Sequence, residues 1–109
     1  MNEISIEDFM KLDLRIVEVT KSRRIPSKSR ILIVEVDLGN GETREIVVGG
    51  GEFYEPEFFI GRKMVLLGNL QPKIIAGIES RGMLLAADFM KRPYWLQVEK
   101  SVPPGSKVH

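Results

Sequence analysis

The sequence predicts an all-β protein, a five-stranded Greek-key barrel with short helical turns and a C-terminal extension. Five short apolar segments have the composition of strands, glycine-rich turns separate several of them, and a helical segment lies between the third and the fourth. This order is that of the OB-fold, in which the loops joining strands one to two and four to five border the ligand face. A chain of 109 residues suits one domain, 1–109, with 93–109 as the extension.

The composition is that of an ordinary globular protein, with 43% hydrophobic and 28% charged residues. The absence of cysteine excludes a disulfide framework and thiolate metal sites. No apolar run approaches the length of a membrane span, and the N-terminus lacks the basic start of a secretory signal. We therefore expect a cytoplasmic protein that does not associate with membranes.

The N-terminal segment predicts a short capped helix followed by a bent strand. Ser5 is the expected N-cap, because acidic and then apolar residues follow it directly. The strand runs from Leu12 to Lys21, and its apolar residues change face part-way along, from Leu12, Leu14 and Ile16 to Val17 and Val19. Such a change of phase indicates a bulge, which lets a strand bend around a barrel.

The second and third strands are expected to form a hairpin. In Ile31 to Leu38 one apolar face is formed by Leu32, Val34, Val36 and Leu38, with Glu35 and Asp37 opposite, which is typical of a strand. Gly39-Asn40-Gly41 is a strong signal for a tight turn, and Thr43 to Val48 is the returning strand.

The remaining elements follow the glycine triplet 49–51. Glu52 to Ile60 is expected to form one or two short helical turns, with Pro56 in a first turn and Gly61 as a C-terminal cap. The later strands are expected at Lys63–Leu67, Met83–Ala87 and Leu96–Val98.

Two connections carry the candidate binding residues. The segment between strands one and two holds no acid, and its cations are Lys21, Arg23, Arg24, Lys28 and Arg30. It is either a solvated loop or a loop that contacts phosphates, where lysine and arginine gain affinity by releasing counterions. The half-apolar connection 69–82 is either packing filler or a binding loop. Because an OB-fold places both connections on one side of the barrel, their coincidence favours binding.

Catalysis finds little support in the sequence. The one histidine is His109, the final residue, which is expected to be a frayed end. The sequence offers no serine–histidine pairing, cysteine nucleophile or carboxylate–histidine metal spacing. The triplet 49–51 lacks the lysine of a phosphate loop. We expect a protein that is not an enzyme, with no catalytic residue, no metal and no cofactor.

The aromatic residues fall into two groups. Four lie near the predicted helix, namely Phe53, Tyr54, Phe58 and Phe59. They could stack on bases, but their spacing favours packing in the core. Tyr94 and Trp95 lie in an apolar tail segment, and aromatic residues are enriched at protein interfaces. We therefore predict that Tyr94 and Trp95 lie in the interface of a homodimer.

Eight motifs follow one another along the chain. They are Asp8-Phe-Met-Lys-Leu-Asp-Leu-Arg15, Val36-Asp-Leu-Gly39, Glu42-Thr-Arg-Glu-Ile-Val47, Tyr54-Glu-Pro-Glu57, Ile60-Gly-Arg-Lys63, Asn69-Leu-Gln-Pro72, Gly77-Ile-Glu-Ser-Arg-Gly-Met83 and Val102-Pro-Pro-Gly-Ser-Lys107. Together they resemble the tRNA-binding domain family. That family includes the C-terminal domain or beta subunit of methionyl-tRNA synthetase, free-standing tRNA-binding proteins, EMAP-II-like cytokine domains and chaperone-like CsaA proteins.

The resemblance implies an OB-fold that dimerises through its terminal extensions and binds the outer corner of tRNA by shape. Arg30 takes the place of a basic residue at the start of the second strand. The positions near the tRNA face are matched by Asn69, Ser80 and Met83.

The chain departs from its relatives in the charge of the connection 69–82. Basic residues of the relatives are replaced here by Gln71, Ile74 and Ala76. Lys73 and Arg81 partly restore that charge.

The sequence therefore predicts a non-catalytic homodimer that binds tRNA by its structure and assists methionyl-tRNA synthetase in trans. The predicted RNA-binding residues are Lys21, Arg23, Arg24, Lys28, Arg30, Asn69, Lys73, Ser80, Arg81 and Met83. The alternative is a CsaA-like protein-export chaperone that binds unfolded polypeptide in an apolar groove near the dimer interface.

Overall fold

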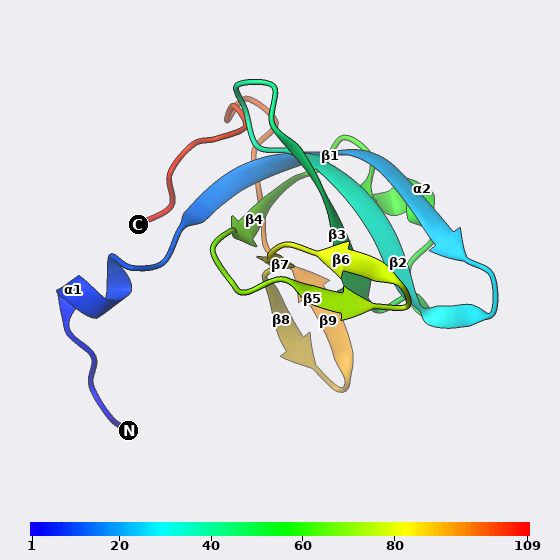
Figure 1. Ribbon diagram of the computed structural model, residues 1–109, viewed down its shortest axis with the longest axis horizontal. Coiled ribbons are helices and arrows are strands. Elements are labelled where there is room, and N and C mark those ends of the chain that lie inside the picture. The colour runs from blue at the N-terminus through cyan, green and yellow to red at the C-terminus, as the bar shows by residue number, and fades with distance from the viewer.

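The structure is a computed structural model that describes residues 1–109. Two short helices and ten strands follow one another along the chain (Figure 1). Their bounds are α1 (Ile6–Phe9), β1 (Leu14–Ile25), β2 (Lys28–Asp37), β3 (Thr43–Gly49), α2 (Pro56–Phe59), β4 (Lys63–Leu67), β5 (Lys73–Ile75), β6 (Ile78–Ser80), β7 (Met83–Leu84), β8 (Ala86–Phe89), β9 (Arg92–Trp95) and β10 (Gln97–Val98). Neither helix is long and apolar enough to cross a bilayer.

The main sheet has the strand order β10-β4-β1-β2-β3, with β7 also paired to β4, and every pairing is antiparallel. The backbone ladder does not close into a barrel, because β3 has no paired strand on its outer edge. Side chains bridge that opening instead. The Val47 amide donates to Ser80 Oγ at 3.1 Å, and Arg44 Nη1 donates to the Gly68 and Arg81 carbonyls at 2.7 and 3.0 Å. The all-β, OB-fold-like class predicted from the sequence is confirmed.

Strand β1 buries apolar residues on both of its faces. Leu14 and Ile16 pack in a small cluster with Val65, whereas Val17 and Val19 are buried in the main core. The pairing with β2 shifts register between Val19 and Lys21, so the bulge lies after Val19 and not at the predicted change of face between Ile16 and Val17, where the pairing with β4 is regular. Leu12 is exposed and precedes the strand, so it does not share the face of Leu14.

The main core is a cluster of 13 buried residues centred between β1–β4 and α2. Phe59 is completely buried, with its ring 5.6 Å from Trp95 and 5.9 Å from Tyr54 between centroids. Core packing was the favoured prediction for the aromatic residues of 53–59, and Tyr54, Phe58 and Phe59 confirm it. Phe53 is exposed.

Three segments differ from their predicted structure. The basic segment is not a loop, because β1 continues to Ile25 and β2 starts at Lys28, which leaves only a tight turn between them. The connection 69–82 contains the β5–β6 hairpin, which turns at Ala76 and Gly77 with φ of 51° and 80°. The fifth predicted strand is split into β7 and β8, and β8 pairs with β9.

The C-terminal residues return to the start of β1. Gly105 N donates to Ile16 O at 2.7 Å, Ile16 N donates to Ser106 O at 2.8 Å, and Val108 N donates to Leu14 O at 2.9 Å. Lys63 is only 7% exposed, and its side chain holds the turn at residues 100–102, which precedes this C-terminal segment. Its Nζ donates to the Lys100 and Val102 carbonyls at 3.0 and 2.6 Å, so a buried ammonium has the partners that it needs.

Candidate nucleic-acid interface

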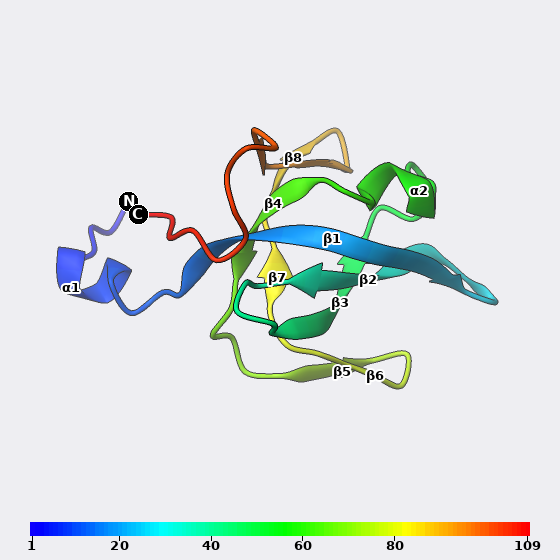
Figure 2. The same cartoon turned by 90° about the horizontal axis from the view of Figure 1, so that it is seen from above.

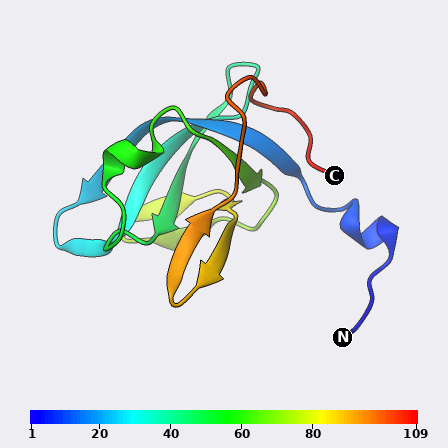
Figure 3. The same cartoon turned by 180° about the vertical axis from the view of Figure 1, so that it is seen from behind.

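The β1–β2 and β5–β6 hairpins point toward the same end of the molecule, with β2 and β3 between them (Figures 1 and 2). Helix α2 and the β8–β9 hairpin lie on the opposite side (Figures 2 and 3). In an OB-fold, oligonucleotides bind the face of strands two and three and the two loops beside it. We call the surface between the two hairpins the inter-hairpin face. Both predicted binding segments therefore border this face.

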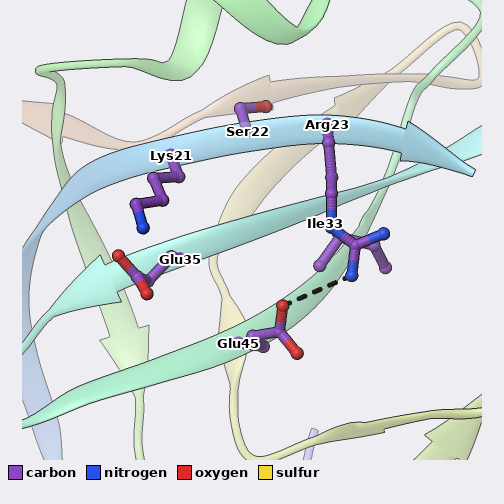
Figure 4. Close-up of a pocket in the computed structure, with 6 residues that line it drawn as sticks. All are labelled: Lys21, Ser22, Arg23, Ile33, Glu35 and Glu45. Carbon is purple, nitrogen blue, oxygen red and sulfur yellow. Dashed lines mark hydrogen bonds and ion pairs between the residues drawn. The ribbon is translucent and has the colours of Figure 1, made fainter.

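The outward side of β1, β2 and β3 carries a shallow cavity of about 360 Å³ (Figure 4). Lys21 and Arg23 line it from β1, and Glu35 and Glu45 face them from β2 and β3. Arg23 Nη2 lies 3.4 Å from Glu45 Oε2, so part of its charge is neutralised. Lys21 forms no ion pair and is exposed. Of these two cations, Lys21 is the one without an ion pair, and Glu35 is its partner across the strands (Figure 4).

Arg23 and Arg24 are neighbours on β1, so their side chains leave the hairpin on opposite faces. The Arg24 guanidinium turns away from the inter-hairpin face. It donates to the Gly51 and Tyr54 carbonyls at 2.9 and 3.1 Å and lies 3.5 Å from a Glu55 carboxylate oxygen. The structure therefore places Arg24 as a clamp on the turn that enters α2, in a pocket that Lys28 also lines.

The tip of the β1–β2 hairpin supplies exposed charge. Lys28 is exposed and forms no ion pair, and the Arg30 side chain is 86% exposed with its Nε 3.9 Å from Glu52. On the other hairpin, Lys73 is exposed without an ion pair. Arg81 has its Nε 3.7 Å from Glu79 Oε1. Four cations of the two hairpins are thus exposed without an ion pair closer than 3.9 Å: Lys21, Lys28, Arg30 and Lys73. Lys21 lies across the strands from Glu35, and Lys28 lines a pocket with Glu52 on the other face of its hairpin.

A groove of about 610 Å³ runs between β3 and the 69–83 segment. It brings together Asn69, Lys73, Ser80 and Met83, all of which are predicted binding residues. Ser80 is buried, and its hydroxyl accepts from Val47 N and donates to Gly82 O. Asn69 Oδ1 accepts from Asp13 N at 2.9 Å, and Nδ2 donates to Lys11 O at 2.6 Å. Ser80 and Asn69 therefore shape the groove, whereas Lys73 and Met83 remain accessible in it.

Two residues that the sequence analysis did not single out, Arg44 and Asp13, hold the groove in place. Arg44 donates to the carbonyls at both ends of the 68–81 segment. Asp13 O accepts from Gly68 N, and the Asp13 carboxylate accepts from Arg15, which lowers the pKa of Asp13 below its ordinary value. The ionised carboxylate therefore stabilises the fold above its unfolded pKa, and the contribution is lost as pH falls through the lowered pKa. Both residues lie in motifs that carry the family resemblance, and this membership is the sequence feature that could have identified them.

The structure separates the predicted interface pair on β9. Tyr94 is on the surface, with its ring 6.3 Å from that of exposed Phe89. Trp95 is half-buried and packs against Phe59 and Tyr54, so its ring belongs to the core of the protomer.

Comparisons with known proteins give a consistent set of relatives. Residues 14–107 match the family described as "Putative tRNA binding domain". The chain is 43% identical over 107 residues to the methionine–tRNA ligase of Thermotoga maritima, covering 98% of this chain. It spans only 17% of that ligase.

Two solved structures share the fold over nearly the whole chain. A MetRS-related protein from Pyrococcus horikoshii has a TM-score of 0.93 and 33% identity, with 100% of both chains covered. The chaperone CsaA from Bacillus anthracis has a TM-score of 0.88 and 29% identity, with 99% of this chain and 100% of that chain covered.

Proposed function

We propose that this chain, which belongs to the tRNA-binding domain family, captures structured tRNA on its inter-hairpin face. The domain is non-catalytic in itself, although its relatives include parts of a ligase. We propose that it acts by binding alone, in the cytoplasm where tRNA is used. The observation that carries the proposal is the placement of four exposed cations, Lys21, Lys28, Arg30 and Lys73, on two hairpins that project toward the same end of the molecule (Figures 1 and 2).

The mechanism is electrostatic capture followed by recognition of shape. Exposed lysine and arginine gain affinity when a polyanion releases its condensed counterions. Double-stranded RNA is recognised largely by shape and by backbone contacts, which suits two projecting hairpins that hold cations at fixed positions. Arg23 and Arg81 have carboxylate oxygens at 3.4 and 3.7 Å, so they contribute less than Lys21, Lys28, Arg30 and Lys73.

Binding of total tRNA to the protein on filters, measured across a salt series, tests this proposal. Four phosphate contacts should give a slope of about −3 for the logarithm of affinity against the logarithm of salt concentration. The expected result is tRNA retention that declines along this slope. Absent retention, or retention insensitive to salt, would contradict it.

The proposal includes assembly as a homodimer that assists methionyl-tRNA synthetase in trans. The support for a synthetase partner is the similarity to methionine–tRNA ligases across almost the whole chain. The support for a dimer is the exposed apolar surface on and beside the β8–β9 hairpin, which includes Phe89, Tyr94 and Leu96. Exposed apolar patches of this kind mark interaction surfaces.

Tyr94→Asp is expected to weaken the dimer by at least about tenfold, because a charge would be buried in an apolar interface. Sedimentation equilibrium at micromolar concentration measures the effect. Lys91→Asp, at the tip of the same hairpin, is the control for added acid. A wild-type protein that sediments as a monomer would remove the dimer from the proposal.

The second candidate is binding of unfolded polypeptide. It is favoured by the structural similarity to a CsaA chaperone and by the apolar residues Leu70, Ile75 and Met83 in the groove. Reduced, carboxymethylated α-lactalbumin, which stays unfolded, separates the two candidates. Binding of this polypeptide without salt dependence, together with no retention of tRNA, supports the second candidate over the first.

A further inference from the structure

The groove between β3 and the β5–β6 hairpin differs in chemistry from the charged surface around it. Leu70, Ile75 and Met83 give it an apolar lining, and Met83 is 48% exposed. Its volume of about 610 Å³ lies in the range of small-molecule sites in proteins. An apolar lining suits a flat, weakly polar group and disfavours a phosphate, which would lose its hydration without gaining partners.

The charges at the groove have one sign. Lys73 pairs across the hairpin with Ser80, and both side chains face the groove. Ile74 pairs with Glu79 on the other face of the hairpin, so the acid of this hairpin points away. The lining therefore contains one cation and no acid. This arrangement complements a group that is itself apolar but is joined to phosphates on both sides.

Besides Lys73, one polar side chain in the groove has no partner within the protein. The side chains of Asn69 and Ser80 are occupied by backbone groups of the protein. The Gln71 amide makes no hydrogen bond, is exposed and lines the groove. An amide carries both donors and an acceptor, which are the groups needed to bind the edge of a nucleobase.

We propose that the groove holds one unstacked nucleobase of the bound RNA. This inference rests on the proposed tRNA binding and adds to it a specific class of ligand. The base stacks on the Met83 thioether, its edge binds the Gln71 amide, and Lys73 contacts an adjacent phosphate. Thioethers make favourable contacts with aromatic rings, and proteins read RNA mainly through bases splayed out of helices.

Met83→Ala is expected to weaken tRNA binding by about twofold to tenfold, which corresponds to the loss of one sulfur–aromatic contact. The slope of affinity against salt should be unchanged, because no charge is removed. Ile74→Ala is the matched control: it removes an exposed apolar side chain from the outer face of the same hairpin. It is expected to bind tRNA as the wild type does.

A direct readout uses protein labelled with ¹³C at its methionine methyl groups. A nucleobase stacked on Met83 shifts that methyl resonance upfield through its ring current. Met64, which is buried in the core, and Met90, which is exposed at the tip of β8–β9, should stay unmoved. Inorganic polyphosphate supplies phosphates without bases, so it should compete with tRNA for the cations and leave Met83 in place.

Retained tRNA that leaves the Met83 methyl unmoved would overturn the base pocket while leaving the proposed tRNA binding intact. A Met83 shift caused equally by polyphosphate would also overturn it, because the shift would then report charge and not stacking. Complete failure to retain tRNA would reject the proposed function and the pocket together. A shift produced by carboxymethylated α-lactalbumin but not by tRNA would assign the groove to polypeptide.

Discussion

Replacing Lys21, Lys28, Arg30 and Lys73 together by glutamine is expected to weaken tRNA binding by about 100-fold to 1,000-fold at 0.1 M salt. Each phosphate contact that is lost lowers the slope of affinity against salt by about one. The four side chains have no hydrogen bond and no ion pair closer than 3.9 Å, so the fold should be unaffected. Filter binding across a salt series measures the slope, and urea unfolding checks the fold.

The matched control removes four positive charges elsewhere, from exposed lysines outside the inter-hairpin face: Lys11, Lys91, Lys100 and Lys107. Both variants have the same net charge, so they differ only in where the charge was removed. The control is expected to retain most of the slope and most of the affinity, because charges beyond a Debye length are screened. Equal losses in the two variants would show that net charge decides binding and that the face does not.

Arg24→Ala is expected to lower the free energy of unfolding by about 2–3 kcal/mol, although Arg24 lies in the same basic segment as Arg30. Its guanidinium makes two charge-assisted hydrogen bonds, to the Gly51 and Tyr54 carbonyls, and loses both. Arg30→Ala is expected to change that free energy by less than about 0.5 kcal/mol, because the side chain is almost fully exposed. Urea unfolding of the two variants measures the contrast.

Arg24→Lys refines the same experiment. Lysine keeps the charge but cannot donate in two fixed directions, so it should recover only part of the lost stability. The two positions are expected to differ in the opposite sense in tRNA binding. Arg30→Ala lowers the slope of affinity against salt, whereas Arg24→Lys leaves that slope unchanged. Wild-type stability for Arg24→Ala would show that the clamp contributes nothing.

The elements with a clear apolar period could be predicted from sequence alone. Alternation over 31–38 fixes β2 and its buried face, and Gly39-Asn40-Gly41 fixes the turn to β3. The outer part of the β1–β2 hairpin could not be predicted in this way. Charged and polar residues occupy both of its faces from Lys21 to Arg30, so no apolar period marks it, and pairing across the hairpin holds it extended.

The candidate site was predicted in outline but not in the roles of its residues. The family resemblance identifies Asn69 and Ser80 as positions near the tRNA face, and the structure places both in the groove. Their hydrogen-bond partners are backbone groups far away in the sequence, Asp13 N and Val47 N. Such partners depend on the tertiary fold, so sequence patterns cannot distinguish a residue that shapes the groove from one that contacts RNA. The same limit explains Arg24 and Trp95, whose partners lie across the domain.

The return of residues 105–108 to the start of β1 has a consequence for synthesis on the ribosome. Leu14 and Ile16 leave the exit tunnel early, but the backbone groups that complete their edge belong to Ser106 and Val108. Until those residues emerge, one edge of the earliest strand is open, and an open edge is a template for pairing with another chain. Contacts this distant in sequence also slow folding. The nascent domain is therefore most exposed to misassociation just before its synthesis is completed.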